Sequence, residues 1–166
     1  MNRDDSPIYL DSACMTLRPQ QVIDAITEYY TDYPACGGRS VHKLSWQVTE
    51  KFEMARDSLR KFVGAEQPSE IVFTKNATEG MNIVANGLRL KKGDHVLTSD
   101  KEHNANVVPW HHLSKYNGIK YDVLEPKDNY FFDLEALKES ITSNTKIFSF
   151  VHTCLLYTSP SPRDWL

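Results

Sequence analysis

The amino-acid sequence predicts an α/β fold built on a mostly parallel sheet. From residue 71 to residue 151, short β-type segments alternate with helical patterns, an order typical of parallel strands joined by right-handed crossovers. The last β-type segment, residues 147–151, is an apolar run of the kind found in strands buried on both faces. The chain has 166 residues, which is enough for one compact domain with a sizeable core.

Two helices are predicted before this alternation begins. Residues 7–12 are expected to be extended, and Pro19 suits the first position of a helix. Ser45 is expected to cap a second, longer helix, and Gly64 suits the C-terminal end of that helix. Apolar residues at helical spacing form one face of each predicted helix: Val22, Ile26, Tyr29 and Tyr33 in the first, and Val48, Phe52, Ala55, Leu59 and Phe62 in the second.

The alternating part can be divided from its apolar patterns and turn residues. It is predicted, in order, as strand 71–73, helix 77–88, strand 96–98, helix 106–116, strand 119–124, a helix begun by Asp133, and strand 147–151. A turn at 92–94 precedes the second strand, and Gly118 ends the second of these helices.

Composition excludes several classes of function. The formal net charge is -3 and no basic stripe is present, which argues against nucleic acid or an anionic membrane as a partner. No apolar run approaches the roughly 20 residues of a membrane span, and residues 1–5 begin no secretory signal, so we expect a cytoplasmic protein. The three cysteines are too few and too scattered for a disulfide framework or a zinc site, so no metal is expected.

Residues 154–166 interrupt the pattern. They are rich in serine and proline, have no helical or strand period, and resemble the in-frame translation of a transposon-type sequencing adapter. We interpret them as a cloning or assembly scar and exclude them from the fold, so that the natural protein is expected to continue differently after Thr153. Composition alone leaves a natural disordered tail as the alternative.

Polar residues follow three of the predicted strands, where ligands bind in open parallel sheets. After strand 71–73, Ala77 and Thr78 begin a helix, and its N–H groups, its positive dipole end and the Thr78 hydroxyl suit a phosphate. The alternative is purely structural, because Asn76 and Glu79 have the spacing of a capping box.

Two histidines follow the other two strands. His103 lies on a loop where its imidazole suits stacking on a planar ring or proton exchange, and the alternative is an ordinary surface histidine. His152 either donates a hydrogen bond into the site or simply ends a strand. His111 and His112 are expected on a solvated helix face.

Several motifs resemble those of the cysteine desulfurase branch of the class V aminotransferases, over about residues 9–153. Residues 9–13 (YLDSA) match the motif with which the family begins, and residues 38–45 (GRSVHKLS) are similar to its R-G-x-H-x-L-S loop, with Ser40 where glycine is usual. Residues 73–82 (FTKNATEGMN) resemble the F-T-x-x-x-T-E-x-x-N signature. Residues 102–110 (EHNANVVPW) resemble the E-H-x-A-N-x-x-P-W run, which is highly specific when it follows the T-E-G-x-N motif.

The resemblance implies a cofactor, pyridoxal 5'-phosphate (PLP), and a role for each matching residue. Ala77 and Thr78 would bind its phosphate, and His103 would stack on the pyridine ring and act in proton relay. His152 would lie beside the cofactor, while Arg39 and His42 would belong to a loop placed near the partner's active site in a homodimer. For these two loop residues, a solvated loop is an almost equal alternative.

The family also implies a fold, a division of the chain and an activity. The fold would be a partial three-layer α/β/α large domain of a PLP-dependent transferase of fold type I. An N-terminal segment and helix (1–35) would precede the N-terminal part of that PLP-binding domain (36–153). The whole enzyme would convert L-cysteine to L-alanine, leave a persulfide on an enzyme cysteine, and supply sulfur for iron–sulfur clusters, with a possible sulfur-acceptor protein as partner.

Alternatives remain open at this point. The Schiff-base lysine, the aspartate paired with the ring nitrogen and the persulfide cysteine lie beyond Thr153 in that family, so residues 1–166 alone are expected to be inactive. A selenocysteine lyase, an amino-acid aminotransferase or an epimerase fits the same motifs. A non-catalytic truncated α/β fragment is an alternative of another class. A nucleotide-binding module is disfavoured because neither glycine-rich phosphate motif is present.

Overall fold

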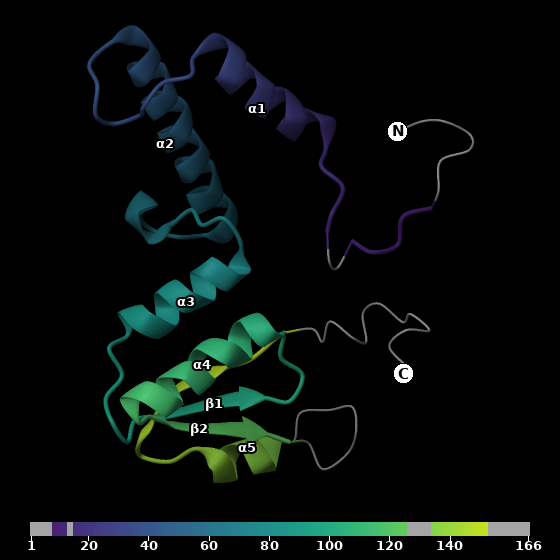
Figure 1. The fold of residues 1–166 in the computed structure, drawn as a ribbon, viewed down its shortest axis with the longest axis vertical. Helices are drawn as coiled ribbons and strands as arrows, with labels where there is room; N and C mark the ends of the chain where they lie inside the picture. The colour runs from purple at the N-terminus through teal and green to yellow at the C-terminus, as the bar shows by residue number, and fades with distance from the viewer. Residues whose placement is uncertain (1–7, 13–14, 126–133, 153–166) are drawn as a thin grey trace. The chain divides into compact units, whose positions relative to one another are not determined.

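The computed structural model of the chain describes residues 8–12, 15–125 and 134–152. It divides into two units, Met1–Phe73 and Thr74–Leu166, and each is described by itself (Figure 1). In chain order the elements are α1 (Gln20–Asp32), α2 (Lys43–Val63), the 3-10 helix η1 (Pro68–Glu70), α3 (Ala77–Gly87), β1 (His95–Ser99), α4 (Asn104–Asn117), β2 (Lys120–Leu124), α5 (Leu134–Ser140) and β3 (Thr145–Ser149). No helix among the described residues is both long and apolar enough to cross a membrane.

The first unit contains the two predicted N-terminal helices. Pro19 precedes α1, and Gly64 ends α2 with a φ of 73°, as expected for glycine in a left-handed C-cap. The Lys51 ammonium donates to the Glu28 carboxylate and, at 2.9 Å, to the hydroxyl of the buried Tyr33, which joins the two helices. The hydrogen bond with Glu28, followed by that with Tyr33, raises the pKa of Lys51.

Two predictions for the first unit are wrong. The N-cap of α2 is His42 rather than Ser45: the His42 Nδ1 accepts from the Ser45 N–H at 3.3 Å. Ser45 is fully buried, and its hydroxyl donates instead to the Cys36 carbonyl at 2.6 Å. Residues 71–73 form no strand, since no described strand pairs with them. Instead the Ile71 carbonyl accepts from Arg56 at 3.2 Å, and the Phe73 ring lies 5.0 Å from that of Phe52.

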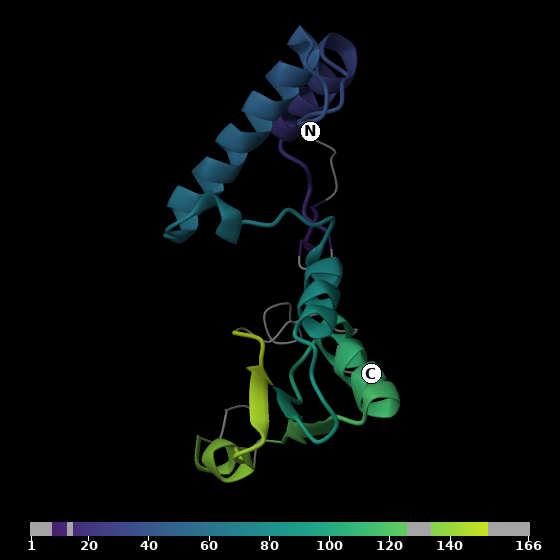
Figure 2. The same ribbon diagram turned by 90° about the vertical axis from the view of Figure 1, so that its left-hand side faces the viewer.

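The second unit is a parallel sheet with the strand order β2-β1-β3. The β1–α4–β2 connection leads from the central strand to one edge of the sheet, and the β2–α5–β3 connection crosses over β1 to the other edge. Because both crossovers are expected to be right-handed, their helices belong on opposite faces. Figure 2 shows α3 and α4 on one side of the strands and α5 on the other. This arrangement confirms the prediction of a partial three-layer α/β/α fold.

The core of the second unit lies between β1 and the helices of one face. Its buried members are Ala85, Val96, Trp110, Leu113 and Ile119. Every residue of β1 is buried, whereas β3 is only half-buried. The prediction that strand 147–151 is buried on both faces is therefore wrong, because in the described sheet β1 takes the centre and β3 lies at an edge. The Gly118 end of α4 is confirmed, with a φ of 72°.

Candidate functional site

His103 is held at the start of α4 by its own ring. It is the N-cap residue of this helix, and its Nδ1 accepts from the Ala105 N–H at 3.0 Å. In a neutral imidazole, an Nδ1 that accepts leaves the proton on Nε2. His103 is exposed, and no partner for its Nε2 is found in the described part of the chain. The ring therefore has one nitrogen fixed by the helix start and a second nitrogen free to face a ligand.

Glu102, which precedes this histidine, joins three segments of the second unit. Its Oε1 accepts from the Ser99 hydroxyl at 2.5 Å and from the Val151 N–H at 2.7 Å. Its Oε2 accepts from the Asn106 side-chain amide at 2.7 Å. These contacts connect the end of β1, the first turn of α4 and the segment that follows β3.

Asn106 continues this set of hydrogen bonds into the core. Its Oδ1 accepts from the Trp110 indole N–H at 3.1 Å and from the Ser149 hydroxyl at 2.7 Å. Trp110 is 1% exposed and belongs to the hydrophobic core. The loop before α4 is thus tied both to the strand ends and to the packed interior.

The start of α3 leaves three hydrogen-bond donors available. The Asn76 side chain caps this helix by accepting from the Glu79 N–H at 2.9 Å, and Glu79 accepts from the Lys75 N–H at 2.6 Å. Only the Asn76 half of the expected capping box is therefore present, since Glu79 binds the Lys75 N–H rather than that of Asn76. This cap does not use the N–H groups of Ala77 and Thr78 or the Thr78 hydroxyl, for which no partner occurs among the described residues.

Four of the predicted site residues lie in the second unit, on elements that meet at one edge. Figure 1 shows that α3 and α4 both begin on the side toward which the strand arrows point, and the two helices pack against each other. Ala77 and Thr78 therefore lie in the first turn of one helix and His103 at the start of its neighbour. His152 directly follows Val151, whose N–H binds Glu102, so its backbone is tied to the same edge.

The two loop residues with a predicted role lie in the first unit. Arg39 is exposed in the turn at residues 37–39, and His42 is the N-cap of α2. Their role beside a partner's active site stays a prediction. His111 and His112 are exposed on α4, as expected, and their rings lie against Tyr121 and Tyr116 respectively.

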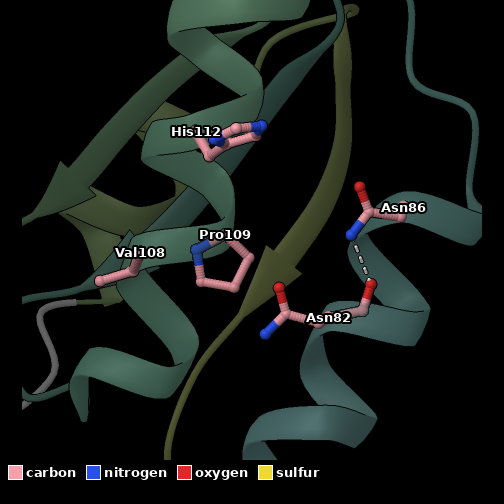
Figure 3. A pocket seen from close by; sticks show the side chains of 5 residues that line it. All are labelled: Asn82, Asn86, Val108, Pro109 and His112. Carbon is pink, nitrogen blue, oxygen red and sulfur yellow. Dashed lines mark hydrogen bonds between the residues drawn. The ribbon is translucent and has the colours of Figure 1, made fainter.

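A pocket of about 220 Å³ lies between α3 and α4 (Figure 3). It is lined by Asn82, Asn86, Val108, Pro109 and His112. The Asn82 and Asn86 side-chain amides donate back to carbonyls of α3, at 2.9 and 2.8 Å. The lining includes none of the residues predicted to bind cofactor, so this pocket is not the predicted site.

The linking roles of Glu102 and Asn106 were not predicted from the sequence. The signal that points to them is their spacing, because Glu102, Asn106 and Trp110 follow one another at intervals of four residues. Side chains at that spacing are neighbours along a helix. The contact with Val151 has no local signal, since it joins residues 49 positions apart.

The chain is similar to known proteins over most of its length. The family model for aminotransferase class V matches residues 8–154. A probable cysteine desulfurase from Streptomyces coelicolor is 38% identical over 164 residues, covering 95% of this chain and 39% of that protein. One from Pyrococcus abyssi is 41% identical over 136 residues, covering 81% of this chain and 34% of that protein.

A solved structure agrees with these relatives. The apo cysteine desulfurase from Thermococcus onnurineus NA1 superposes with a TM-score of 0.80 at 36% identity, covering 88% of this chain and 36% of that one. The chain thus spans between 34% and 39% of the length of these three proteins. Since the family model matches nearly all of it, the chain belongs to the class V aminotransferase family.

Proposed function

We propose that these residues form the N-terminal part of a PLP-dependent cysteine desulfurase. The observation that carries the proposal is the common edge at which α3, α4 and the strand ends meet, with His103 and the free donors of Thr78 on neighbouring helices. The relatives named as cysteine desulfurases support the choice of reaction. In this reaction L-cysteine yields L-alanine, and its sulfur remains on an enzyme cysteine as a persulfide.

The donor set at the start of α3 fits the cofactor's phosphate. The N–H groups of Ala77 and Thr78 and the Thr78 hydroxyl are donors beside the positive end of a helix dipole, which is the usual protein environment of a phosphate. His103 would lie against the pyridine ring, with its Nε2 proton available to a substrate or ring oxygen, and His152 would lie beside the cofactor. When bound, pyridoxal phosphate supplies an electron sink for negative charge at the substrate Cα.

The phosphate role of Thr78 can be tested by titrating the whole protein with PLP. Losing a hydrogen bond to a charged group costs about 1.5–3 kcal/mol, so Thr78→Val is expected to weaken PLP binding by about 10–150-fold. Thr78→Ser keeps the hydroxyl and serves as the matched control. The visible absorption band of bound cofactor gives the affinity, and equal affinities for the two variants would refute the assignment.

The role of His103 needs a different comparison. His103→Ala in the whole protein is expected to keep PLP bound through its phosphate while reducing alanine release from cysteine. His112→Ala, which changes another exposed histidine of α4, is the control. Residues 1–166 alone are expected to release no alanine. Full activity of His103→Ala would contradict the proposed site.

We further propose a cytoplasmic homodimer in which Arg39 and His42 serve the partner's site, with a sulfur-acceptor protein as a possible partner. This arrangement predicts complementation between Arg39→Ala and Thr78→Val, assayed at a PLP concentration too low to load the Thr78→Val site. In a random mixture, half of the dimers are mixed and each has one intact site, so about a quarter of the activity should return. No recovery on mixing would place Arg39 in its own subunit's site or outside any site.

A further inference from the structure

The carboxylate of Glu102 is hydrogen-bonded by three described residues, and each of them acts as a donor. The Ser99 hydroxyl, the Val151 N–H and the Asn106 amide approach its two oxygens at 2.5, 2.7 and 2.7 Å. A carboxylate accepts and does not donate, so it satisfies all three at once. Glu102 is half-buried, which increases the cost of leaving any of these donors without an acceptor.

Trp110 determines which atoms donate and which accept in the hydrogen bonds that run from Glu102 through Asn106. An indole N–H only donates, so the atom of Asn106 that faces it must be the carbonyl oxygen Oδ1. The Ser149 hydroxyl donates to the same oxygen. The Asn106 amide nitrogen is therefore directed at Glu102, and that position requires an acceptor. A glutamine at 102 would accept from Ser99 and Val151 but would set its own amide nitrogen against that of Asn106.

This set of bonds holds the backbone on both sides of the predicted ring-stacking histidine. Glu102 precedes His103 and Asn106 lies one helical turn further on. The only hydrogen bond of the His103 ring to another described residue is its cap on Ala105. The position of the ring therefore depends on the backbone of residues 102–106. The bond to Val151 fixes the backbone before His152 in the same way.

We propose that Glu102 and Asn106 are positioning residues, which set the imidazole of His103 against the cofactor ring by tying the start of α4 to the end of β3. We call the hydrogen bonds that Glu102 and Asn106 make to Ser99, Ser149 and Val151 the clamp. The role of His103 rests on the proposed function, whereas the clamp itself is independent of it. The proposal predicts that the two side chains act as a donor–acceptor pair whose polarity is reversible.

The decisive experiment exchanges the pair in the whole protein loaded with PLP. Glu102→Gln alone sets two amide nitrogens face to face, and Asn106→Asp alone sets two carboxylates face to face. Combined, Glu102→Gln and Asn106→Asp restore every hydrogen bond, because the new carboxylate accepts from the new amide, from Trp110 and from Ser149. Glu70→Gln is the control, since the described donors to Glu70 are the backbone N–H groups of Glu66 and Gln67 in the first unit.

Two measurements are made on each of the four variants and on the unsubstituted protein. Hydrogen exchange of residues 149–152 without cofactor reports on the clamp itself, and each single variant should exchange about tenfold faster at Val151. Visible circular dichroism of bound PLP reports on the setting of its ring. Each single variant should retain the absorption band but lose at least about half of the dichroism, with kcat falling more than the KM for cysteine rises. The combined variant and the control should match the unsubstituted protein in both readouts.

The outcomes separate the two levels of the inference. Unchanged exchange in the single variants would overturn the clamp. Faster exchange with unchanged dichroism and kcat would overturn the positioning role. A combined variant no better than the singles would overturn the reversible pair, and if a single variant fails to fold, recovery in the combined variant still supports it. Absence of any PLP band in the unsubstituted protein would refute the proposed function, while the exchange measurement would still test the clamp.

Discussion

Replacing Trp110 tests how far the core and the hydrogen bonds of the site depend on each other. The side chain is 1% exposed. Aromatic side chains bury about 150–250 Å², which at about 25 cal/mol per Å² corresponds to about 4–6 kcal/mol. Trp110→Ala should therefore lower the free energy of unfolding by about 3–5 kcal/mol. Trp110→Phe keeps one ring and loses the indole N–H, so its expected cost is about 1–2 kcal/mol.

The amide groups of β1 are the best place to measure this loss. The strand is central and fully buried, so its amides exchange with solvent when the second unit opens. A loss of 1–2 kcal/mol corresponds to exchange that is about 5–30-fold faster. The measurement is made on the peptide containing residues 95–99 in the whole protein. Trp46→Phe is the control, because Trp46 is 63% exposed and lies in the first unit, and it should leave β1 unchanged.

A second background isolates the indole N–H from the packing. In Asn106→Ala the acceptor of the indole is already gone, so Trp110→Phe should cost less there than in the unsubstituted protein. The difference is expected to be about 0.5–1.5 kcal/mol. If Trp110→Phe costs the same in both backgrounds, within about 0.3–0.5 kcal/mol, the bond between Trp110 and Asn106 contributes nothing and the reasoning is refuted.

Two further predictions concern the helix end at Gly118 and the ion pairs of α2. Gly118→Ala should lower the free energy of unfolding by about 1–2 kcal/mol, because the residue has a φ of 72° and a Cβ there would lie 3.2 Å from the Lys92 Cγ. Urea unfolding measures this loss. Gly87→Ala is the control and should not destabilise the protein, because Gly87 has open space around it and no left-handed φ. The hydrogen bond from Lys61 lowers the pKa of Asp57 below its ordinary 3.8, so its stabilisation is present above that pH and is lost as the pH falls through the lowered value. Asp57→Asn should therefore lower the melting temperature at neutral pH but not in strong acid, and an offset that persists at low pH would contradict this.

The periodicity of the sequence predicts the alternating strands and helices of the second unit well, because each of these patterns is local. Parallel strands joined by helices need alternating patterns, and the turn at 92–94 and the stop at Gly118 depend on local backbone geometry that glycine favours. Residues 71–73 have the same apolar pattern as a strand. A strand also requires a partner, and the described sheet provides none for them. Pattern alone contains no information about that partner.

Helix caps and long-range side-chain bonds are predicted less well. Ser45 belongs to the residue types preferred as N-caps and histidine does not, yet the Ser45 hydroxyl is used by the Cys36 carbonyl, and the imidazole of His42 takes the cap. Which side chain caps the helix is thus decided by a loop carbonyl nine residues away. The bond from Val151 to Glu102 likewise depends on the return of β3 beside β1, which a local motif does not specify.

The two ends of the sheet differ in how their histidines are used. At the amino end, His95 is buried, with its Nδ1 2.7 Å from the Thr145 hydroxyl oxygen and its Nε2 3.2 Å from the Asp122 carboxylate. The Nδ1 is hydrogen-bonded to Thr145, whereas the buried Nε2 makes no hydrogen bond among the described residues despite its distance to Asp122. At the carboxyl end, His103 is exposed and uses one nitrogen for its cap, while the second has no partner among the described residues. The unpartnered ring nitrogen is thus buried at the amino end and exposed at the carboxyl end, which is why we place the proposed cofactor site at the carboxyl end.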